Sequence, residues 1–331
     1  MAMSPLFLLA GAVVLLIFAL VLRRTLLSWQ ERRRRAVQER LLPAAYELLD
    51  SGVRPAGLSQ ADTEIFDGLL MRLTRLLETE PRRPIADYFE SSGAVARECD
   101  RLRDRRDWRR ATAAAMLGDL GSAAAGAALV RTLGDPSLDV RMAAAHSLGR
   151  LRLADGVTPL LEAMAAGSLP RSVGCAAVAG IGSAAVPSLL AHGAGADADG
   201  RLNAARLVGQ LGDPSCTPAL LDWLRDPEPR VRAASAEALE RLGDAAAAAA
   251  LAEVLDDDDA DVRVAVASAL GYIGGEEVLE RLLTAARTDS FEPARAAAEA
   301  AARLDPARVA TAASDDGGPH LREAADRLAL R

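Results

Sequence analysis

The sequence contains no lysine, so arginine supplies all 39 of its basic residues. It is also poor in aromatic residues: half of its 331 residues are hydrophobic, but only 3% are Phe, Tyr or Trp. A compact globular core of this length normally uses more of these large side chains. The alanine- and leucine-rich composition instead favours thin helices that pack closely in pairs.

Several kinds of site are also missing. The three cysteines are isolated and form no CxxC spacing, so neither a disulfide framework nor a zinc site is indicated. The three histidines have no partner at metal-ligand spacing, and no Ser/His/Asp set, phosphate loop or dinucleotide-binding glycine motif is present. We therefore expect no catalytic residue, metal ion or cofactor. The residues concerned are Cys99, Cys175, Cys216, His146, His192 and His320.

Charge is distributed unevenly along the chain. The formal net charge is −7, but residues 23–40 hold seven Arg and two Glu, a net of +5, which leaves −12 for residues 41–331. A nucleic-acid-binding protein should carry the opposite balance, so we expect no nucleic-acid partner. The acidic run 256–259 lacks the alternating spacing and distal Glu of a calcium loop, and we interpret it as a solvated turn.

The sequence does contain an internal repeat. Arginines in similar surroundings recur at intervals of 31, 30, 30, 31, 31, 32 and 27 residues. A fixed period near 30 residues predicts a solenoid, in which each unit buries its apolar face only against its neighbours. The aligned arginines are Arg110, Arg141, Arg171, Arg201, Arg232, Arg263, Arg295 and Arg322.

Each unit is expected to be two antiparallel helices. An acidic residue two positions before the aligned arginine, as in Asp139 and Asp261, can cap the second helix. Proline, as in Pro187 and Pro218, suits the start of the first helix because its missing amide hydrogen would have no partner there. The predicted fold class is therefore all-α, with about eight helix pairs forming a superhelical α-solenoid over residues 94–331.

The pattern D-V-R-x-x-A-A-x-x-L-G, clearest at residues 139–149, 230–240 and 261–271, resembles HEAT repeats, in particular the short HEAT-like repeats of phycobilisome lyases. The whole chain resembles a membrane-anchored bacterial form of such a protein. The resemblance implies an α-solenoid that binds other proteins and whose second helices line a concave surface. It does not imply one activity, and the paired His-Glu steps of hydroxylase-type HEAT enzymes do not occur in this sequence.

The beginning of the chain predicts a membrane anchor within residues 1–22. Residues 6–22 contain no charge and no strongly polar group, and as a helix they would span about 26 Å, close to the roughly 30 Å hydrocarbon core. A cleaved signal peptide is the alternative, but no basic residue precedes the apolar run and no small-x-small cleavage site follows it. Because the positive flank should stay inside, we expect a single-pass protein of the inner membrane with its N-terminus outside and its solenoid in the cytoplasm.

Residues 23–42 predict a basic juxtamembrane helix. Its arginines could bind anionic headgroups, or they could only set the topology of the anchor. The candidates for membrane-surface contact are Arg23, Arg24, Arg32, Arg33, Arg34 and Arg35.

Residues 43–93 do not fit the repeat and predict a helical adaptor that also caps the first unit. We expect one helix over residues 58–80, ended by Pro81 and Pro84, and a short helix over residues 85–90. A cap is needed because the terminal units of a solenoid lack one neighbour.

Candidate binding residues follow from the repeat register. Residues five and nine positions after an aligned arginine should share the exposed face of the second helix, since they lie about one turn apart. Arg and Tyr are favoured at protein interfaces, although an ordinary solvated face is the alternative. The candidates are His146, Arg150, Arg206, Gln210, Glu237, Arg241 and Tyr272, together with Ser268.

Two further predictions concern the repeat itself. The aligned arginines are interpreted as structural, pairing with the aspartates two residues earlier and with neighbouring units, and a binding ladder is the alternative. Glycine is concentrated over residues 167–200. Because glycine weakens a helix interior by up to about 1 kcal/mol relative to alanine, we predict a soft point there, where the curvature of the superhelix changes.

Taken together, these features predict a membrane-anchored cytoplasmic scaffold. It would bind a protein partner, in a membrane-associated complex, through the concave face of the solenoid, and it would have no chemistry, cofactor or small-molecule substrate of its own. The alternative is a bilin lyase-like enzyme or a chaperone of chromophore attachment, for which a bound chromophore would be diagnostic. The predicted anchor and the few aromatic residues favour the scaffold.

Overall fold

The computed structural model describes residue 24 and residues 35–76, 79–315 and 318–329. The predicted anchor at residues 1–22 and the candidate residues Arg23, Arg32, Arg33 and Arg34 therefore lie outside the described part of the chain. Arg24 and Arg35 are described, and both are exposed.

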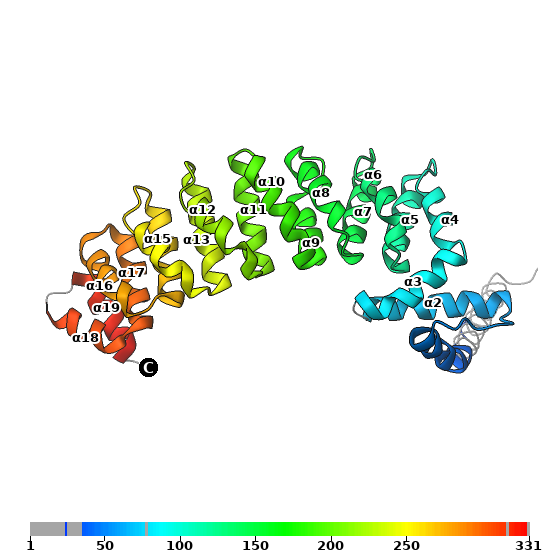
Figure 1. Cartoon of the computed structure of the whole chain (residues 1–331), viewed down its shortest axis with the longest axis horizontal. Coiled ribbons are helices and arrows are strands. Elements are labelled where there is room, and N and C mark those ends of the chain that lie inside the picture. The colour runs from blue at the N-terminus through cyan, green and yellow to red at the C-terminus, as the bar shows by residue number, and fades with distance from the viewer. Residues whose placement is uncertain (1–23, 25–34, 77–78, 316–317, 330–331) are drawn as a thin grey trace, which may run out of the picture.

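Helices stacked side by side make an elongated, curved array (Figure 1). Eight helix pairs follow one another from residue 94 onward, and the described residues include no β-strand, so the predicted all-α solenoid is confirmed. We number these pairs as units 1 to 8. The first helices are α4 (Ala94–Arg101), α6 (Gly126–Thr132), α8 (Val157–Ala165), α10 (Val186–Gly195), α12 (Thr217–Trp223), α14 (Ala248–Glu253), α16 (Glu276–Thr288) and α18 (Pro306–Ser314).

Each aligned arginine lies within the first five residues of a second helix. The second helices are α5 (Asp107–Leu120), α7 (Leu138–Arg150), α9 (Arg171–Ile181), α11 (Ala198–Leu211), α13 (Pro229–Leu242), α15 (Ala260–Ile273), α17 (Phe291–Leu304) and α19 (Gly318–Ala329). Short 3-10 turns join units 1 to 6: η1 (Ala123–Ala125), η2 (Ala154–Gly156), η3 (Gly182–Ala185), η4 (Pro214–Cys216) and η5 (Ala245–Ala247).

The helix starts follow the predicted chemistry, with one correction. Pro187 and Pro218 lie in the first turns of α10 and α12, as expected. Asp261, however, does not cap α15: the cap is Asp259, whose carboxylate accepts hydrogen bonds from the amides of Asp261 and Val262. Asp139 likewise lies inside the first turn of α7. Both residues remain well placed, because a carboxylate is favourable near the positive end of a helix.

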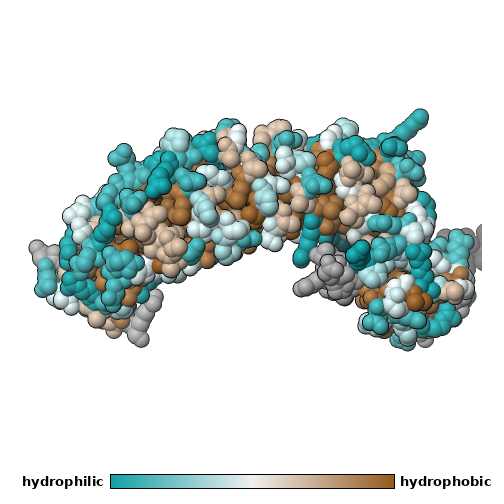
Figure 2. All heavy atoms as spheres, viewed as in Figure 1, coloured by the Kyte–Doolittle hydropathy of each residue, from teal (hydrophilic) through white to brown (hydrophobic). Residues whose placement is uncertain are grey.

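The core is built from leucine, valine and alanine. Seven residues after each aligned arginine of units 1 to 6 stands a fully buried aliphatic side chain: Leu117, Leu148, Val178, Val208, Leu239 and Leu270. Hydrophobic groups show through along the middle of the face drawn in Figure 2, and hydrophilic groups gather toward its edges. Each unit thus buries apolar surface against the next, which is the main stabilising contribution in a solenoid.

Small residues let neighbouring second helices approach closely. A Cβ added at Gly149 would lie 2.7 Å from the carbonyl oxygen of Ala177, and one at Gly209 would lie 2.7 Å from the Cβ of Ala238. Gly271 is equally close to Ala300 in the pair α15 and α17. Only glycine fits these positions without moving a backbone, so the spacing of the second helices is set by these contacts.

The described residues between positions 35 and 91 include three helices: one over residues 35–51, α2 (Gln60–Leu76) and α3 (Thr79–Ser91). α2 packs against α5, and α3 packs against α4 and α5, so these helices cover the first unit. Aromatic side chains are concentrated here, where Tyr88 makes edge-to-face contacts with Phe66 and Phe89.

One sequence prediction fails in this region. The helix over residues 35–51 is continuous and runs through the predicted domain boundary at residues 42/43, which stays a prediction. Pro81 and Pro84 do not end a helix, because α3 begins at Thr79 and contains both. Proline inside a helix removes one backbone hydrogen bond. Burial of Ile85 and Phe89 on the same helix offsets that loss.

Among the described residues, one helical stretch, Arg171–Gly195, is long and apolar enough to cross a membrane. In the fold it is α9, η3 and α10, with Gly182 in a left-handed conformation (φ 77°) between them. Several of its large apolar side chains, including Val178 and Leu189, are buried in the solenoid core. Packing between units therefore accounts for these side chains.

Candidate functional site

The predicted binding residues lie on four second helices, α7, α11, α13 and α15. Seven of the eight side chains are exposed, and Ser268 is half-buried. The repeat register therefore placed these residues correctly on the solvent-exposed side of the second helices. We call this set the second-helix stripe; its members are His146, Arg150, Arg206, Gln210, Glu237, Arg241, Ser268 and Tyr272.

A shallow groove of about 500 Å³ opens within this stripe, between α11, α13 and α15. Three stripe residues line it, one from each helix: Arg206, Glu237 and Ser268. Carboxylates outnumber guanidinium groups along the groove, since Glu240 and two aspartates join Glu237, against Arg206 and Arg230. The groove therefore suits a polar surface with basic groups better than an apolar ligand.

Several stripe residues already have partners in the chain. Arg150 forms an ion pair with Asp119 of α5. The guanidinium of Arg303 lies 4.6 Å from the ring centroid of Tyr272. The charged groups of Arg241 and Glu237 lie 4.0 Å apart on one helix, and an exposed ion pair of this kind contributes little to stability. Arg206 has no ion-pair partner within the described residues, so it is the guanidinium most available to a ligand.

The stripe is interrupted in unit 3. The two equivalent positions there are Ala176 and Gly180, both exposed and both without a polar side chain. Charged side chains therefore stand on both sides of this segment of α9, with Arg150 on α7 before it and Arg206 on α11 after it. The residue types at these two positions were the sequence signal that could have identified this gap.

The aligned arginines form a structural ladder, and their partners differ from the prediction. Arg110, Arg201, Arg232 and Arg263 each donate two hydrogen bonds to an aspartate in the loop of the next unit, at 2.6 to 3.0 Å: Asp135, Asp226, Asp257 and Asp289. The same guanidinium groups also donate to carbonyl oxygens of their own loop. The aspartates two residues earlier take no part, so that half of the prediction is wrong.

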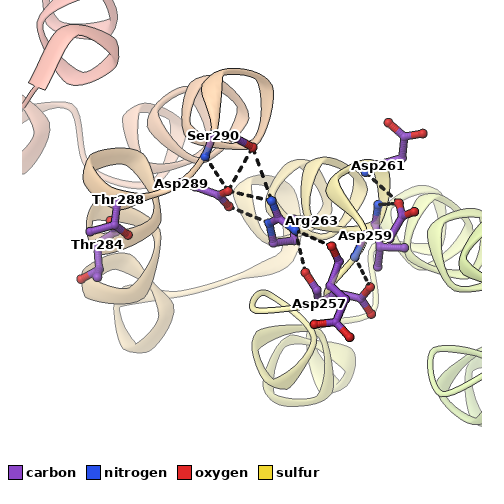
Figure 3. Close-up of polar contacts among 10 residues, drawn as sticks. Asp257, Asp259, Asp261, Arg263, Thr284, Thr288, Asp289 and Ser290 are labelled. Carbon is purple, nitrogen blue, oxygen red and sulfur yellow. Dashed lines mark hydrogen bonds and ion pairs between the residues drawn. The ribbon is translucent and has the colours of Figure 1, made fainter.

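Figure 3 shows one rung of the ladder, with Arg263 held between two loops. Its Nε and Nη2 donate to the carboxylate of Asp289, both at 2.8 Å, and its Nη1 donates to the carbonyl of Asp257 at 2.7 Å. The hydrogen bond from Arg263 holds the pKa of Asp289 below its ordinary value. Likewise, the bond from Arg110 lowers the pKa of Asp135. Bidentate arginine–carboxylate pairs of this kind link unit 1 to unit 2 and join units 4, 5, 6 and 7 in succession.

The ladder fails where the acceptor is missing. An aspartate stands six residues before the aligned arginine in units 1, 2, 5, 6 and 7, but Ala165 and Gly195 occupy that position in units 3 and 4. Arg141 therefore donates instead to the carbonyl of Ser168, at 2.7 Å. Arg171 has only the side-chain oxygen of Asn203, at 3.1 Å on the surface.

The second helices also separate at this point. α9 and α11 have the smallest contact of any two successive second helices. Leu207 of α11 is buried at the position that Ser147, Ala177, Ala238 and Ala269 occupy in other units, so a large side chain stands where the others have a small one. Ala179 on α9 is exposed, whereas its equivalents Gly149, Gly209 and Gly271 are buried. We call this place the α9/α11 junction.

Metal or thiol chemistry has little support in the described part of the chain. No group of three His, Cys, Asp or Glu side chains there could hold a metal ion. Burial raises the pKa of all three thiols, which disfavours the reactive thiolate: Cys99, Cys175 and Cys216.

A HEAT-repeat family model matches residues 98–181, 186–265 and 253–303, which together make up more than half of the chain. The protein belongs to the HEAT-repeat family. Its matched region runs from unit 1 into unit 7, as the resemblance of the repeat copies implied. No curated protein sequence matches this HEAT-repeat protein significantly.

Several solved structures are similar to it. Human deoxyhypusine hydroxylase in complex with glycerol shares 18% identity over 81% of this chain and 97% of its own, with a TM-score of 0.33. The CpcE–CpcF complex of phycocyanin lyase from Nostoc sp. PCC7120 shares 22% identity over 76% and 92%, with a TM-score of 0.29. The Escherichia coli protein YibA shares 18% identity over 84% and 100%, with a TM-score of 0.39. At such low sequence identity, these similarities bear on the fold and not on the function of this protein.

Proposed function

We propose that this HEAT-repeat protein is a scaffold that binds a protein partner along the second-helix stripe and has no chemistry of its own. The proposal is carried by the groove between α11, α13 and α15, whose lining is predominantly acidic and includes Arg206, a guanidinium with no ion-pair partner among the described residues. The groove is open and mixed in charge, as is typical of the polar parts of protein interfaces rather than of small-molecule pockets.

We also propose that residues 6–22 anchor the protein in the inner membrane, with the N-terminus outside and the solenoid in the cytoplasm. The support is the sequence: an uncharged apolar run precedes a segment with a net charge of +5. Anchoring would raise the concentration of the solenoid near partners that are themselves part of a membrane complex.

Site-specific photo-crosslinking in native membranes tests the stripe. A crosslinker would replace Gln210 or Tyr272 in the full-length protein, with Glu253 on the first helix α14 as the comparison position. We expect one defined partner from the stripe positions and none from position 253. The double variant Arg206→Glu/Arg241→Glu should lose that partner. The matched double variant Arg225→Glu/Arg287→Glu, which reverses two exposed arginines elsewhere, should keep it.

The same crosslinked bands from all positions and both double variants would show that the stripe is only a solvated face. Membrane fractionation tests the second proposal independently. The full-length chain should remain in the membrane after high-salt washing, and a chain without residues 6–22 should not. Protease added to spheroplasts should leave the solenoid intact, and digestion of the solenoid from outside would reverse the proposed orientation.

A further inference from the structure

The loop between α4 and α5 carries the strongest local positive charge in the solenoid. Residues 101–110 hold six arginines and two aspartates, a net of +4, in a body whose residues 41–331 sum to −12. The exposed members of this cluster extend from the loop into the first turn of α5. We call five of them the Arg-Trp patch: Arg103, Arg105, Arg106, Trp108 and Arg109; Arg101 and Asp107 are also exposed but are not counted in it.

The fold does not use most of these side chains. Arg105 and Arg106 have no carboxylate partner within the described residues. Arg103 and Asp100 stand 3.9 Å apart and are both 82% exposed, and Arg109 reaches Asp104 at 3.2 Å on the surface. Surface pairs of this kind contribute little to stability. In contrast, the neighbouring Arg110 is fully engaged in the ladder.

Comparison with the other units shows that the patch replaces the repeat consensus. The residue before the aligned arginine is a fully buried valine in units 2, 5 and 6, namely Val140, Val231 and Val262. In unit 1 it is the exposed Arg109. The loops of those units hold proline, serine and acidic residues where unit 1 has Arg105 and Arg106. Packing between units therefore does not explain the patch.

An exposed tryptophan lies at its centre. Trp108 is 59% exposed, and the guanidinium of Arg109 lies 5.2 Å from the centroid of its ring. Leu138, at the start of the neighbouring α7, is also exposed. Trp and Arg are the residues most often found as energetic anchors of protein interfaces.

We propose that the Arg-Trp patch binds an acidic segment of a partner protein. Free guanidinium groups form bidentate hydrogen bonds with carboxylates, and Trp108 and Leu138 offer apolar contact to a side chain between the acidic residues. The patch is small and the rest of the body is acidic, which favours a short acidic segment over a long polyanion such as nucleic acid. All residues of the patch come before the aligned Arg110, whereas stripe residues lie five and nine positions after an aligned arginine. The patch is therefore separate from the second-helix stripe and does not depend on it.

Fluorescence anisotropy with the full-length protein in nanodiscs of zwitterionic lipid tests the patch. The probe is a short fluorescein-labelled peptide of glutamate, leucine and glycine. The comparison ligands are the same peptide with glutamine for glutamate, a single-stranded DNA and vesicles containing anionic lipid. We expect salt-sensitive binding of the glutamate peptide alone, weakened about tenfold or more in Arg105→Glu/Arg106→Glu and several-fold in Trp108→Ala.

The control variants are Arg225→Glu/Arg287→Glu, with the same change in net charge, and Arg206→Glu/Arg241→Glu in the stripe. Both should bind the peptide as the wild type does, and circular dichroism should show the same thermal unfolding for all variants. The proposal is overturned if the glutamate peptide does not bind, if the patch variants bind it normally, or if the patch variants lose DNA or vesicle binding instead. Loss of peptide binding only in the stripe variant would overturn the patch and leave the scaffold proposal standing.

Discussion

The second helices of units 4 to 7 and the α9/α11 junction follow the same repeat but pack differently. In units 4 to 7, Gly209 faces Ala238 and Gly271 faces Ala300 across successive second helices, and three arginine–aspartate pairs join successive loops. At the junction, Leu207 occupies the position that holds a small residue elsewhere. Arg171 donates to the side-chain oxygen of Asn203 in place of an aspartate. Local helix-forming ability does not distinguish the two regions, because both form complete helices. The contacts between units distinguish them.

The comparison bears on the predicted soft point. Glycine content was the reason for placing it at residues 167–200, and the structure adds two further reasons at the same place: a missing acceptor and a thin helix contact. A change of curvature there remains a prediction. Four experiments would test this difference between regions or the contacts behind it.

The largest expected effect comes from filling the helix contact. Gly209→Leu should destabilise the protein by about 2–3 kcal/mol, because its new side chain would run into Ala238 with no room to move aside. Ala179→Leu introduces leucine at the equivalent position of α9, which is exposed, and should change stability by no more than about 0.5 kcal/mol. Urea unfolding followed by circular dichroism measures both. Equal destabilisation would mean that α11 covers α9 as closely as α13 covers α11.

The ladder should give an intermediate effect. Arg232→Gln removes one partner of a pair whose side chains are 15% and 11% exposed, and should cost about 1–2 kcal/mol. Arg171→Gln, at the junction, should have no measurable effect. If both substitutions cost the same, the hydrogen bond from Arg171 to Asn203 would be as strong as a rung of the ladder.

The same pair predicts an acid dependence. Burial raises the pKa of Asp257, but hydrogen bonds from Arg232 and from the amide of Asp259 outweigh it, so the pKa lies below its ordinary value. A carboxyl with a lowered pKa stabilises the folded state above its unfolded pKa of about 4, and that stabilisation is lost as pH falls toward the folded pKa. Arg232→Gln should therefore lose less stability than the wild type between about pH 5 and pH 2. A parallel loss in both proteins would contradict this assignment.

The smallest effect is local and needs no substitution. Backbone amides of residues 171–200 should exchange with deuterium faster than those of residues 230–275, because local opening is easiest where contacts between units are fewest. Hydrogen-exchange mass spectrometry on the intact protein would resolve the two segments. Exchange at the junction that is no faster than in units 5 and 6 would remove the soft point.

Much of this fold could be predicted because the relevant signals are local and repeated. The arginine period, the prolines of α10 and α12 and the position of Leu148 or Leu270 are each set by neighbours within one helix pair. The exposed face of the second helices followed from the same register, which is why the eight stripe residues were found. The aspartate six residues before the aligned arginine also recurs in the sequence, and it was the signal that could have identified the true ladder acceptors.

Other features depend on contacts that cross from one unit to the next, so sequence reasoning missed them. The stacking of Arg303 on Tyr272 joins two second helices, and the ion pair of Arg150 with Asp119 does the same. Proline at position 84 reads as a helix end in isolation, but packing of α3 against α4 and α5 keeps the helix intact.

The amino-acid sequence by itself determined the class and the number of units: helical, alanine- and leucine-rich, repeating near every 30 residues, with an exposed polar face on the second helices of units 2, 4, 5 and 6. Those properties depend on helix periodicity and capping, which act over a few residues. Only the tertiary structure decided which loop accepts each arginine, how closely each pair of second helices packs, and where the array is interrupted. These outcomes depend on side-chain volume and hydrogen-bond geometry between groups about one repeat apart, where a single alanine, glycine or leucine changes the result.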